Sequence, residues 1–218
     1  MERVITEFID DFSQEIDDEH IYRLREKGFQ ENTPVIDLNV GRMLYFFIQI
    51  FRPKTCIDIG LGGGLSLCYM AKAVHSYGGS VISLEINKYR IDEFKDHIKK
   101  KIIPYFNDNI RIIHANAVDY LKKNDLELGF AFVDGMKKEY TEYFKYIKRK
   151  IIAGGIIVID NIFYSGRSIF LAQYEKNVKK YKAPVSHMRS FIEKVKGDHD
   201  FEKLLLSESD GVLVLRKN

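Results

Sequence analysis

The sequence has few features of a secreted, membrane-spanning or disulfide-stabilised protein. Its 218 residues include only two cysteines, Cys56 and Cys68, which are too few for a disulfide framework, and no C-x-x-C pair indicates zinc. The amino-terminal segment is acidic and amphipathic, whereas a secretory signal needs a basic start and an apolar stretch. The longest apolar runs, 44–51 and 151–159, are far shorter than a membrane span. These absences predict a cytoplasmic protein without a membrane partner.

The chain also lacks a strong charge of either sign. Its net charge is +3, with 45% hydrophobic and 30% charged residues, which is the balance of a globular domain and indicates no nucleic-acid partner by itself. The basic clusters at 99–101, 148–150 and 179–180 are typical of solvated helix faces. With no internal repeat or linker, the whole chain is predicted to form one domain, with helices over 1–50 and the core over 51–218.

Short apolar runs alternate with stretches of helical spacing from residue 55 onward. The predicted strands cover 55–59, 80–85, 109–115, 128–134 and 154–160. The predicted helices between them cover 66–75, 89–102, 118–123 and 139–152. Strand and helix that alternate five times predict an α/β fold in which helices cover both faces of a parallel sheet.

The two ends of the chain depart from this alternation. Apolar positions at three- and four-residue intervals predict helices in the first fifty residues, on both sides of a polar turn around Pro34. After a further predicted helix at 185–195, two apolar runs are separated by Asp210-Gly211, a turn dipeptide that predicts an antiparallel hairpin. The expected sheet is therefore mostly parallel and has seven strands.

A glycine-rich turn, D-I-G-L-G-G-G at 58–64, follows the first predicted strand. Glycine lets the backbone turn sharply and lets a ligand approach the main-chain amides at the start of the next helix. Glu85 ends the second strand, where a carboxylate can accept both hydroxyls of a ribose. Leu65 stands where a dinucleotide fingerprint needs glycine, and no Gly-Lys-Ser/Thr follows for a P-loop. An adenosyl ligand without a pyrophosphate fits better, although an ordinary strand-to-helix turn has a similar sequence.

Three oxygen-bearing side chains end two consecutive predicted strands. Asp134 ends the fourth strand, and Asp160 and Asn161 end the fifth. Because the carboxyl ends of parallel strands meet at one edge of a sheet, these side chains are expected to lie together. Their oxygens suit Mg²⁺, Mn²⁺ or Ca²⁺ better than zinc, although Asp and Asn also favour strand ends for local hydrogen bonding. Lys137 follows closely and could accept a proton from a metal-bound hydroxyl.

Several segments together resemble the cation-dependent O-methyltransferases of the catechol O-methyltransferase type, in particular the bacterial members. DNIFYSGR at 160–167 is similar to the family's D-N-V-L-W-S-G-R, and VDGMKKEYTEYF at 133–144 to its D-A-x-K-x-x-Y. CIDIGLGGGLS at 56–66 is similar to its E-I-G-T-x-x-G-Y-S, and the ending SDGVLVLRK to its G-D-G-L-x-x-x-x-K. These blocks occur in the family's order between about Thr33 and the carboxyl terminus.

The resemblance implies a class I S-adenosylmethionine-dependent methyltransferase with a Rossmann-like fold. Asp134, Asp160 and Asn161 would bind the metal ion, and Lys137 would be catalytic together with Asp134. The residues that would contact S-adenosylmethionine are Ile36, Asp58, Gly60, Ser66, Glu85, Asn116, Ala117 and Asp134.

Two departures from the family pattern concern the cofactor. Ala115-Asn116-Ala117 stands where the family carries Gly-Asp-Ala, and Leu61 replaces a common threonine. The Asn116 carbonyl is expected to accept from the adenine amino group without the charge assistance of a carboxylate. Both departures are expected to weaken cofactor binding and to leave the metal ligands unchanged.

The acceptor hydroxyl is less well defined. Bacterial relatives of this type methylate either small catechol-like phenols or 5-hydroxyuridine at the tRNA wobble position, which gives 5-methoxyuridine. Basic residues at 145–150, 176–182, Arg167, Lys194 and Lys196 favour tRNA, whose phosphates they would contact. A small phenol is the alternative, and a non-catalytic cofactor-binding protein is a second alternative that the open metal position argues against. Relatives of this type commonly dimerise, so a homodimer is expected.

Overall fold

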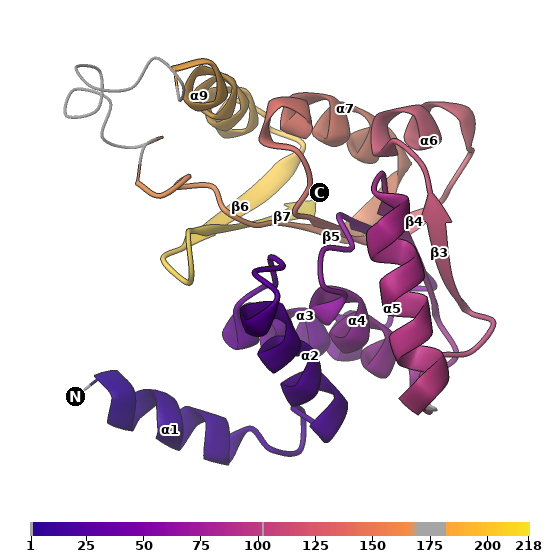
Figure 1. Ribbon diagram of the computed structural model, residues 1–218. Helices are drawn as coiled ribbons and strands as arrows, with labels where there is room; N and C mark the ends of the chain where they lie inside the picture. The colour runs from indigo at the N-terminus through magenta and orange to yellow at the C-terminus, as the bar shows by residue number, and fades with distance from the viewer. Residues whose placement is uncertain (1, 102, 167, 169–181) are drawn as a thin grey trace.

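The computed structural model describes residues 2–101, 103–166, 168 and 182–218, in which helices cover both faces of one sheet (Figure 1). The strands are β1 (Thr55–Ile59), β2 (Ser80–Glu85), β3 (Ile110–His114), β4 (Leu128–Val133), β5 (Ile151–Ile159), β6 (Phe201–Leu206) and β7 (Val212–Lys217). The helices are α1 (Glu2–Phe12), α2 (Glu19–Gln30), α3 (Leu38–Phe51), α4 (Leu65–His75), α5 (Lys88–Lys101), α6 (Ala117–Lys123), α7 (Tyr140–Lys150) and α9 (Lys182–Lys196), together with the 3₁₀ helix η1 (Lys137–Glu139).

The sheet has the strand order β3-β2-β1-β4-β5-β7-β6. The strands from β3 to β5 pair in parallel, whereas β7 pairs antiparallel with both β5 and β6. Ile57 of β1 lies opposite Ile82 of β2 and Ala131 of β4, so these strands end at the same edge. The predicted seven-stranded, mostly parallel sheet with a terminal antiparallel pair is confirmed.

Apolar side chains fill the space on each face of the sheet. Leu44 and Phe94 belong to the core between the sheet and α2–α5, and Leu121 and Phe144 belong to the core beneath α6, α7 and α9. Full burial of one such side chain contributes about 1.5–3 kcal/mol. All six residues of β4 are buried, as expected of a central strand covered on both faces. The residue that follows β4, Asp134, therefore starts from a rigid position.

Both cysteines lie in this core. Cys56 in β1 and Cys68 in α4 are free thiols and are fully buried. Burial raises the pKa of both thiols, so they behave as small apolar residues rather than as nucleophiles.

The boundary between α7 and β5 differs from the prediction. The helix ends at Lys150 and the strand begins at Ile151, whereas helical spacing predicted a helix to Ile152 and a strand from Gly154. The two isoleucines satisfy both the helical and the strand pattern, so the sequence alone could not assign them. Gly154 has a φ of 75°, and the pairing of β5 with β4 shifts register in this region.

Two further features differ from the prediction. The hairpin between β6 and β7 has a longer connection than the predicted turn dipeptide, because β6 ends at Leu206 and β7 begins at Val212. In the amino-terminal region, α2 is a separate helix that the apolar spacing did not distinguish. Its start is fixed by the Asp18 carboxylate, which accepts from the amides of His20 and Ile21.

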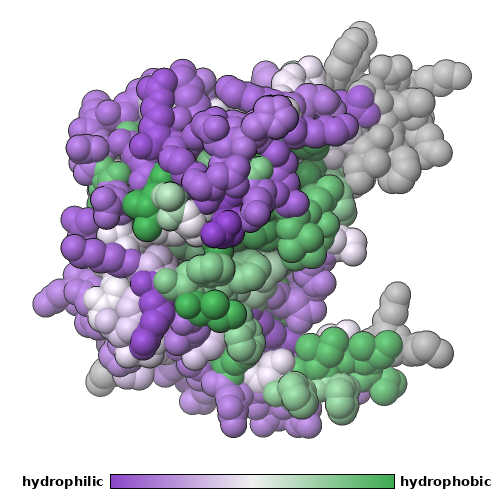
Figure 2. Space-filling model, turned by 180° about the vertical axis from the view of Figure 1, so that it is seen from behind, coloured by the Kyte–Doolittle hydropathy of each residue, from purple (hydrophilic) through white to green (hydrophobic). Residues whose placement is uncertain are grey.

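The first helix, α1, lies beside the body of the molecule and exposes apolar side chains. Val4 and Phe8 are each 68% exposed, and Phe12 is 83% exposed. Figure 2 shows this apolar surface at the lower right of the view. Amphipathic α1 is nevertheless too short for a membrane span, and none of the described helices has the length and hydropathy to cross one.

Candidate functional site

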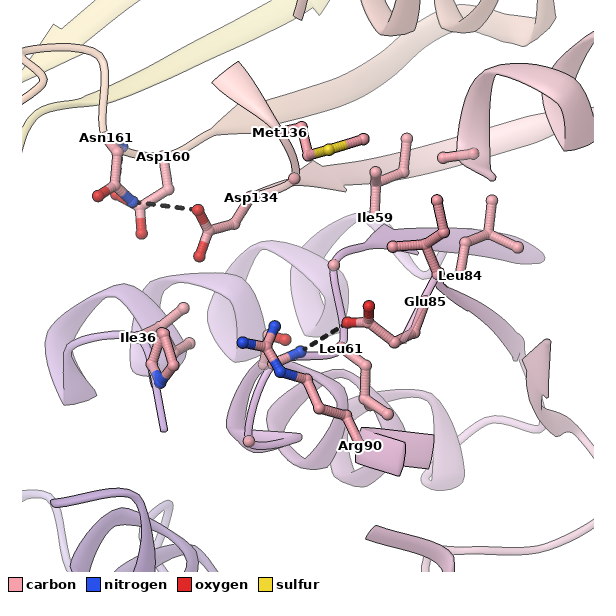
Figure 3. Close-up of a pocket in the computed structure, with 18 of the residues that line it drawn as sticks. Ile36, Ile59, Leu61, Leu84, Glu85, Arg90, Asp134, Met136, Asp160 and Asn161 are labelled. Carbon is pink, nitrogen blue, oxygen red and sulfur yellow. Dashed lines mark hydrogen bonds between the residues drawn. The ribbon is translucent and has the colours of Figure 1, made fainter. Parts of the chain in front are cut away.

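A cavity of about 420 Å³ opens at the carboxyl ends of the parallel strands (Figure 3). Its walls come from the segment 34–37, the glycine turn after β1, and the residues that follow β2, β3, β4 and β5. The predicted site residues that line it are Ile36, Gly60, Ser66, Glu85, Asn116, Ala117, Asp134, Lys137, Asp160 and Asn161. The fold therefore brings almost all of the predicted residues into one cavity.

Asp58 lies behind the cavity wall rather than in it. Its side chain is fully buried and accepts hydrogen bonds from Ser83 Oγ at 2.6 Å and from Ser66 Oγ at 3.3 Å. Burial raises the pKa of Asp58 to about 7 against the opposing effect of the two serines. Side chains alternate along a strand, and here Asp58 points inward. The structure thus gives Asp58 a place from which it orients Ser66, instead of the predicted place against the cofactor.

The glycine turn passes close to the end of β4. Gly60 has a φ of 103°, and a Cβ there would lie 2.4 Å from the carbonyl oxygen of Asp134. Gly64 has a φ of 85°, and a Cβ there would overlap the ring of Phe94 at 2.1 Å. Both positions therefore require glycine for conformation and for space.

Glu85 is held in place at the end of β2. Its Oε1 accepts from the amide of Asn87 at 2.8 Å, and its Oε2 accepts from the amide of Gly62 at 3.3 Å. The side chain is buried and lines the cavity, and each carboxylate oxygen retains a further lone pair. Arg90 of α5 lines the cavity near Glu85 (Figure 3), although the sequence analysis did not select it. Its place in the first turn of the helix that follows the strand-end acid is the signal that could have indicated it.

Asp134, Asp160 and Asn161 meet where β4 and β5 end. The side-chain Nδ2 of Asn161 donates to Asp134 Oδ1 at 3.2 Å, and the backbone amide of Asn161 donates to Asp160 Oδ1 at 2.6 Å. Asn161 has a φ of 62°, a left-handed conformation that asparagine tolerates better than most residues. Burial, and after it the negative charge of Asp134, together raise the pKa of Asp160 to about 7. Two carboxylates at this edge create a negative potential that a cation would relieve.

Lys137 connects this acidic edge to a buried tyrosine. Its Nζ donates to Asp134 Oδ1 at 2.8 Å and to Tyr140 Oη at 2.7 Å. Tyr140 Oη in turn donates to the carbonyl oxygen of Asp160 at 3.1 Å. Tyr140 is the tyrosine of the D-x-x-K-x-x-Y segment, and it was not among the predicted site residues because its ring belongs to the core.

Asn116 has a structural role in addition to the one predicted for its carbonyl. Its Oδ1 accepts from the amide of Asp119 at 3.0 Å and so caps the amino terminus of α6. The residue also lines the cavity. The Oδ1 atom keeps a second lone pair beside the cap, so its hydrogen bond to an adenine amino group stays a prediction.

The loop after β5 is tied to the turn before β7. The amides of Ile162 and Phe163 donate to the carbonyl oxygens of Gly211 and Asp210, at 2.9 and 2.8 Å. The Asp210 carboxylate accepts from the Ser165 amide at 2.7 and 2.8 Å. Two sequence blocks that are far apart in the chain therefore form one support for Asp160 and Asn161. Arg167, which was expected near the site entrance, lies outside the described residues.

Other lining residues were not selected from the sequence. They include Asp37, Leu61, Leu84, Ile86, Met136, Tyr143 and Ser209. Met136 stands at the cavity wall opposite Glu85 (Figure 3). Tyr143 Oη donates to Glu139 Oε2 at 2.7 Å, which fixes the ring beside Gly135, where a Cβ would lie 3.0 Å from it.

A family model described as O-methyltransferase matches residues 10–218 of this chain. The flavonoid 3′,5′-methyltransferase of Vitis vinifera is 27% identical over 192 residues, which cover 85% of this chain and 78% of that protein. The caffeoyl-CoA O-methyltransferase of Medicago sativa is 25% identical over 184 residues, which cover 81% of this chain and 72% of that protein. A SAH-bound methyltransferase structure from Podospora anserina has a TM-score of 0.80 and 22% identity, and covers 97% of this chain and 96% of that chain.

Proposed function

The chain belongs to the O-methyltransferase family, and we propose that it uses S-adenosylmethionine and a divalent cation to methylate a hydroxyl oxygen of a small catechol-like phenol. The observation that supports this most strongly is the grouping of Asp134, Asp160, Asn161 and Lys137 in one cavity. Relatives are described as acting on caffeoyl-CoA and on flavonoids, which carry phenolic hydroxyls. The comparisons support methyl transfer to oxygen, and the choice of phenol is our extension.

S-adenosylmethionine fits the half of the cavity near β1, β2 and β3. Glu85 would accept the ribose hydroxyls, because its carboxylate is fixed by two amides and still has free lone pairs. Ile36 and Ala117 would contact the adenosyl group from opposite walls, and the turn around Gly60 allows close approach to the main chain. Once bound, the cofactor supplies a methyl group that its sulfonium already activates.

A hard divalent cation such as Mg²⁺, Mn²⁺ or Ca²⁺ fits the acidic edge. Asp134 and Asp160 offer carboxylate oxygens, and Asn161 can offer its carbonyl oxygen after a rotation of the terminal amide that exchanges Nδ2 and Oδ1. The raised pKa of Asp160 has burial and the neighbouring carboxylate as its causes, which is the electrostatic condition that a cation corrects. Such a cation would lower the pKa of a coordinated hydroxyl and orient it.

Residues of the protein then accept the proton and exclude water from the reactants. Lys137 reaches the cavity and can accept the proton of the acceptor hydroxyl. Met136 and Tyr143 provide apolar surface that excludes water from the space between the two reactants. Holding the reactants at near-attack distance is worth about 7–11 kcal/mol of the barrier in favourable cases.

Methylation of 5-hydroxyuridine in tRNA is the second candidate. Exposed Lys194 and Lys196 on α9 favour it. The basic face of α7 does not, because Lys148 pairs with Asp198 at 2.6 Å and Lys150 donates to a backbone carbonyl. The segment 176–181 lies outside the described residues.

One experiment separates these candidates. We expect the protein with Mg²⁺ to transfer labelled methyl groups to a vicinal diphenol, and expect chelation to stop the transfer. In parallel, unmodified tRNA is incubated with the protein and its nucleosides are analysed by mass spectrometry. A tRNA substrate would show 5-methoxyuridine and an affinity that falls steeply with salt, whereas a neutral phenol would show little salt dependence. Binding of cofactor without transfer to either acceptor would favour the non-catalytic alternative.

Asn116→Asp is expected to strengthen cofactor binding. One carboxylate oxygen can keep the cap to the Asp119 amide, and the other becomes an acceptor for the adenine amino group. A hydrogen bond to a charged group contributes about 1.5–3 kcal/mol, so the Kd for SAH should fall at least about tenfold. Calorimetry measures this, with Asn124→Asp, which alters an amide at the far end of α6, as the control. An unchanged or larger Kd would contradict the role of Asn116 beside the base.

The homodimer and the cytoplasmic location stay predictions. The apolar side chains that α1 exposes, including Val4, Phe8 and Phe12, offer a surface on which a second copy could pack.

A further inference from the structure

Tyr140 combines a core position with a hydroxyl at the proposed active site. Its side chain is 1% exposed, and its ring lies edge-on to Phe191 of α9 at 5.7 Å between centroids and 6.2 Å from the ring of Tyr143. These contacts fix the ring on both sides. The hydroxyl is therefore held at a defined point between the end of β5 and Lys137.

The single proton of the Tyr140 hydroxyl is already committed. It is donated to the carbonyl oxygen of Asp160, so the hydroxyl can only accept from Lys137. Lys137 therefore has two neighbours, Tyr140 Oη and Asp134 Oδ1, that both act as acceptors.

This arrangement decides where the lone pair of a neutral Lys137 amine can point. A charged amine has three N–H bonds, and a neutral one has two N–H bonds and a lone pair. Two acceptors claim two hydrogens, at 2.7 and 2.8 Å. Within the described part of the chain, Lys137 Nζ makes no hydrogen bond besides these two, and its side chain lines the cavity. A hydroxyl free to donate to the amine would instead occupy that lone pair.

We propose that Tyr140 is a positioning residue. Because its own proton is donated to the Asp160 carbonyl, Tyr140 accepts one N–H bond of Lys137, and the lone pair of the neutral Lys137 amine then points toward the acceptor hydroxyl. This inference rests on the proposed function, in which Lys137 accepts the proton of the substrate hydroxyl. The proton moves from the substrate oxygen to the Lys137 nitrogen, and the two hydrogens bound to Asp134 and Tyr140 stay in place.

The first test does not need catalytic activity. The ammonium protons of Lys137 are followed by ¹H–¹⁵N NMR and are assigned by the loss of their signal in Lys137→Arg. Tyr140→Phe is expected to speed the exchange of these protons with water at least about tenfold, because the variant loses one hydrogen bond to a charged group. Tyr77→Phe is the matched control, because Tyr77 Oη donates to the carbonyl of Pro53 at 3.0 Å outside the cavity. Unchanged exchange in Tyr140→Phe would overturn the proposal.

The second test is a double-mutant cycle on turnover at saturating cofactor and acceptor. Tyr140→Phe is expected to lower kcat about tenfold and Lys137→Met about a hundredfold, while the double variant is no slower than Lys137→Met. The KM for S-adenosylmethionine and the Mg²⁺ concentration for half-maximal rate are expected to stay unchanged. Additive losses, or a shifted Mg²⁺ requirement, would mean that Tyr140 acts through Asp160 and would overturn the proposal. A wild-type protein without transfer activity would refute the proposed function, and the NMR result would still decide whether Tyr140 holds the Lys137 nitrogen.

Discussion

Asp134→Ala is expected to lower kcat/KM for methyl transfer by about 10³-fold or more, the largest catalytic loss among single substitutions in this cavity. Asp134 accepts from both Lys137 and Asn161, and its backbone lies against the glycine turn at Gly60. In the proposed function Asp134 also binds a cation, which stabilises the transition state by several kcal/mol. Each tenfold change in rate corresponds to about 1.4 kcal/mol. One substitution would therefore remove the cation and release two neighbouring site residues.

The informative quantity is the loss of activity in Asp134→Ala compared with the loss of activity in Lys137→Met. Lys137→Met removes a proton acceptor, which is worth about 10²-fold at the lower end of the usual range. Asp134→Asn keeps the volume and one acceptor oxygen, so its rate should respond to raised Mg²⁺, whereas the alanine variant should not. Asp108→Asn, at an exposed position outside the cavity, serves as the control. Near-normal turnover of Asp134→Ala in the presence of chelator would refute the metal role.

The part of the site that the sequence predicted is the part that depends on topology. Asp134 and Asp160 each follow a fully apolar run, and parallel strands must end at one edge, so their proximity follows from the strand assignment alone. Glu85 was predicted by the same argument from β2. The strand positions were reliable because β1, β2 and β4 are almost fully buried, which gives short apolar runs with sharp ends.

The sequence did not predict the features that depend on the direction in which an individual side chain points. Asp58 is two residues before Gly60 of the glycine turn, yet it faces the core and accepts a hydrogen bond from Ser83 of the neighbouring strand. Tyr140 has the sequence pattern of a core residue, and only the three-dimensional structure brings its hydroxyl to Asp160. Asn116 was selected correctly as a lining residue, but its cap to Asp119 is a local choice that an aspartate or asparagine makes equally well.

Arg42 was not singled out from the sequence, although it is the centre of a buried ion-pair network. Its guanidinium donates to Asp17 Oδ2 at 2.9 Å through Nε, to Asp10 Oδ1 at 2.7 Å and to Asn39 Oδ1 at 2.8 Å. Tyr69 Oη donates to the second oxygen of Asp17 at 2.5 Å. The network joins α1, the segment before α2, α3 and α4 across residues that are far apart in the sequence.

Arg42→Met is accordingly expected to lower the free energy of unfolding by about 3–5 kcal/mol, because it leaves Asp17 buried without its cation. Urea denaturation at neutral pH measures the change. Lys88→Met is the control: Lys88 pairs with Asp92 at 2.8 Å, but both side chains are more than half exposed, and the loss should be a small part of that of Arg42→Met. Equal losses in the two variants would show that burial does not strengthen the Arg42 network.

The same substitution should reach the cavity through Asn39. Asn39 accepts from Arg42 and donates to Glu208 Oε1 at 2.7 Å, next to Ser209 in the cavity wall, and Asp37 at the start of α3 also lines the cavity. Without Arg42, the amino-terminal wall loses its fixed position, so the Kd for SAH should rise at temperatures where the variant is still folded. Arg42→Met combined with Asp17→Asn removes the unpaired charge and should recover most of the stability, yet it should not restore the Kd, because the link to Asn39 is still missing. Recovery of both quantities together would mean that the network contributes stability alone and does not hold the cavity wall.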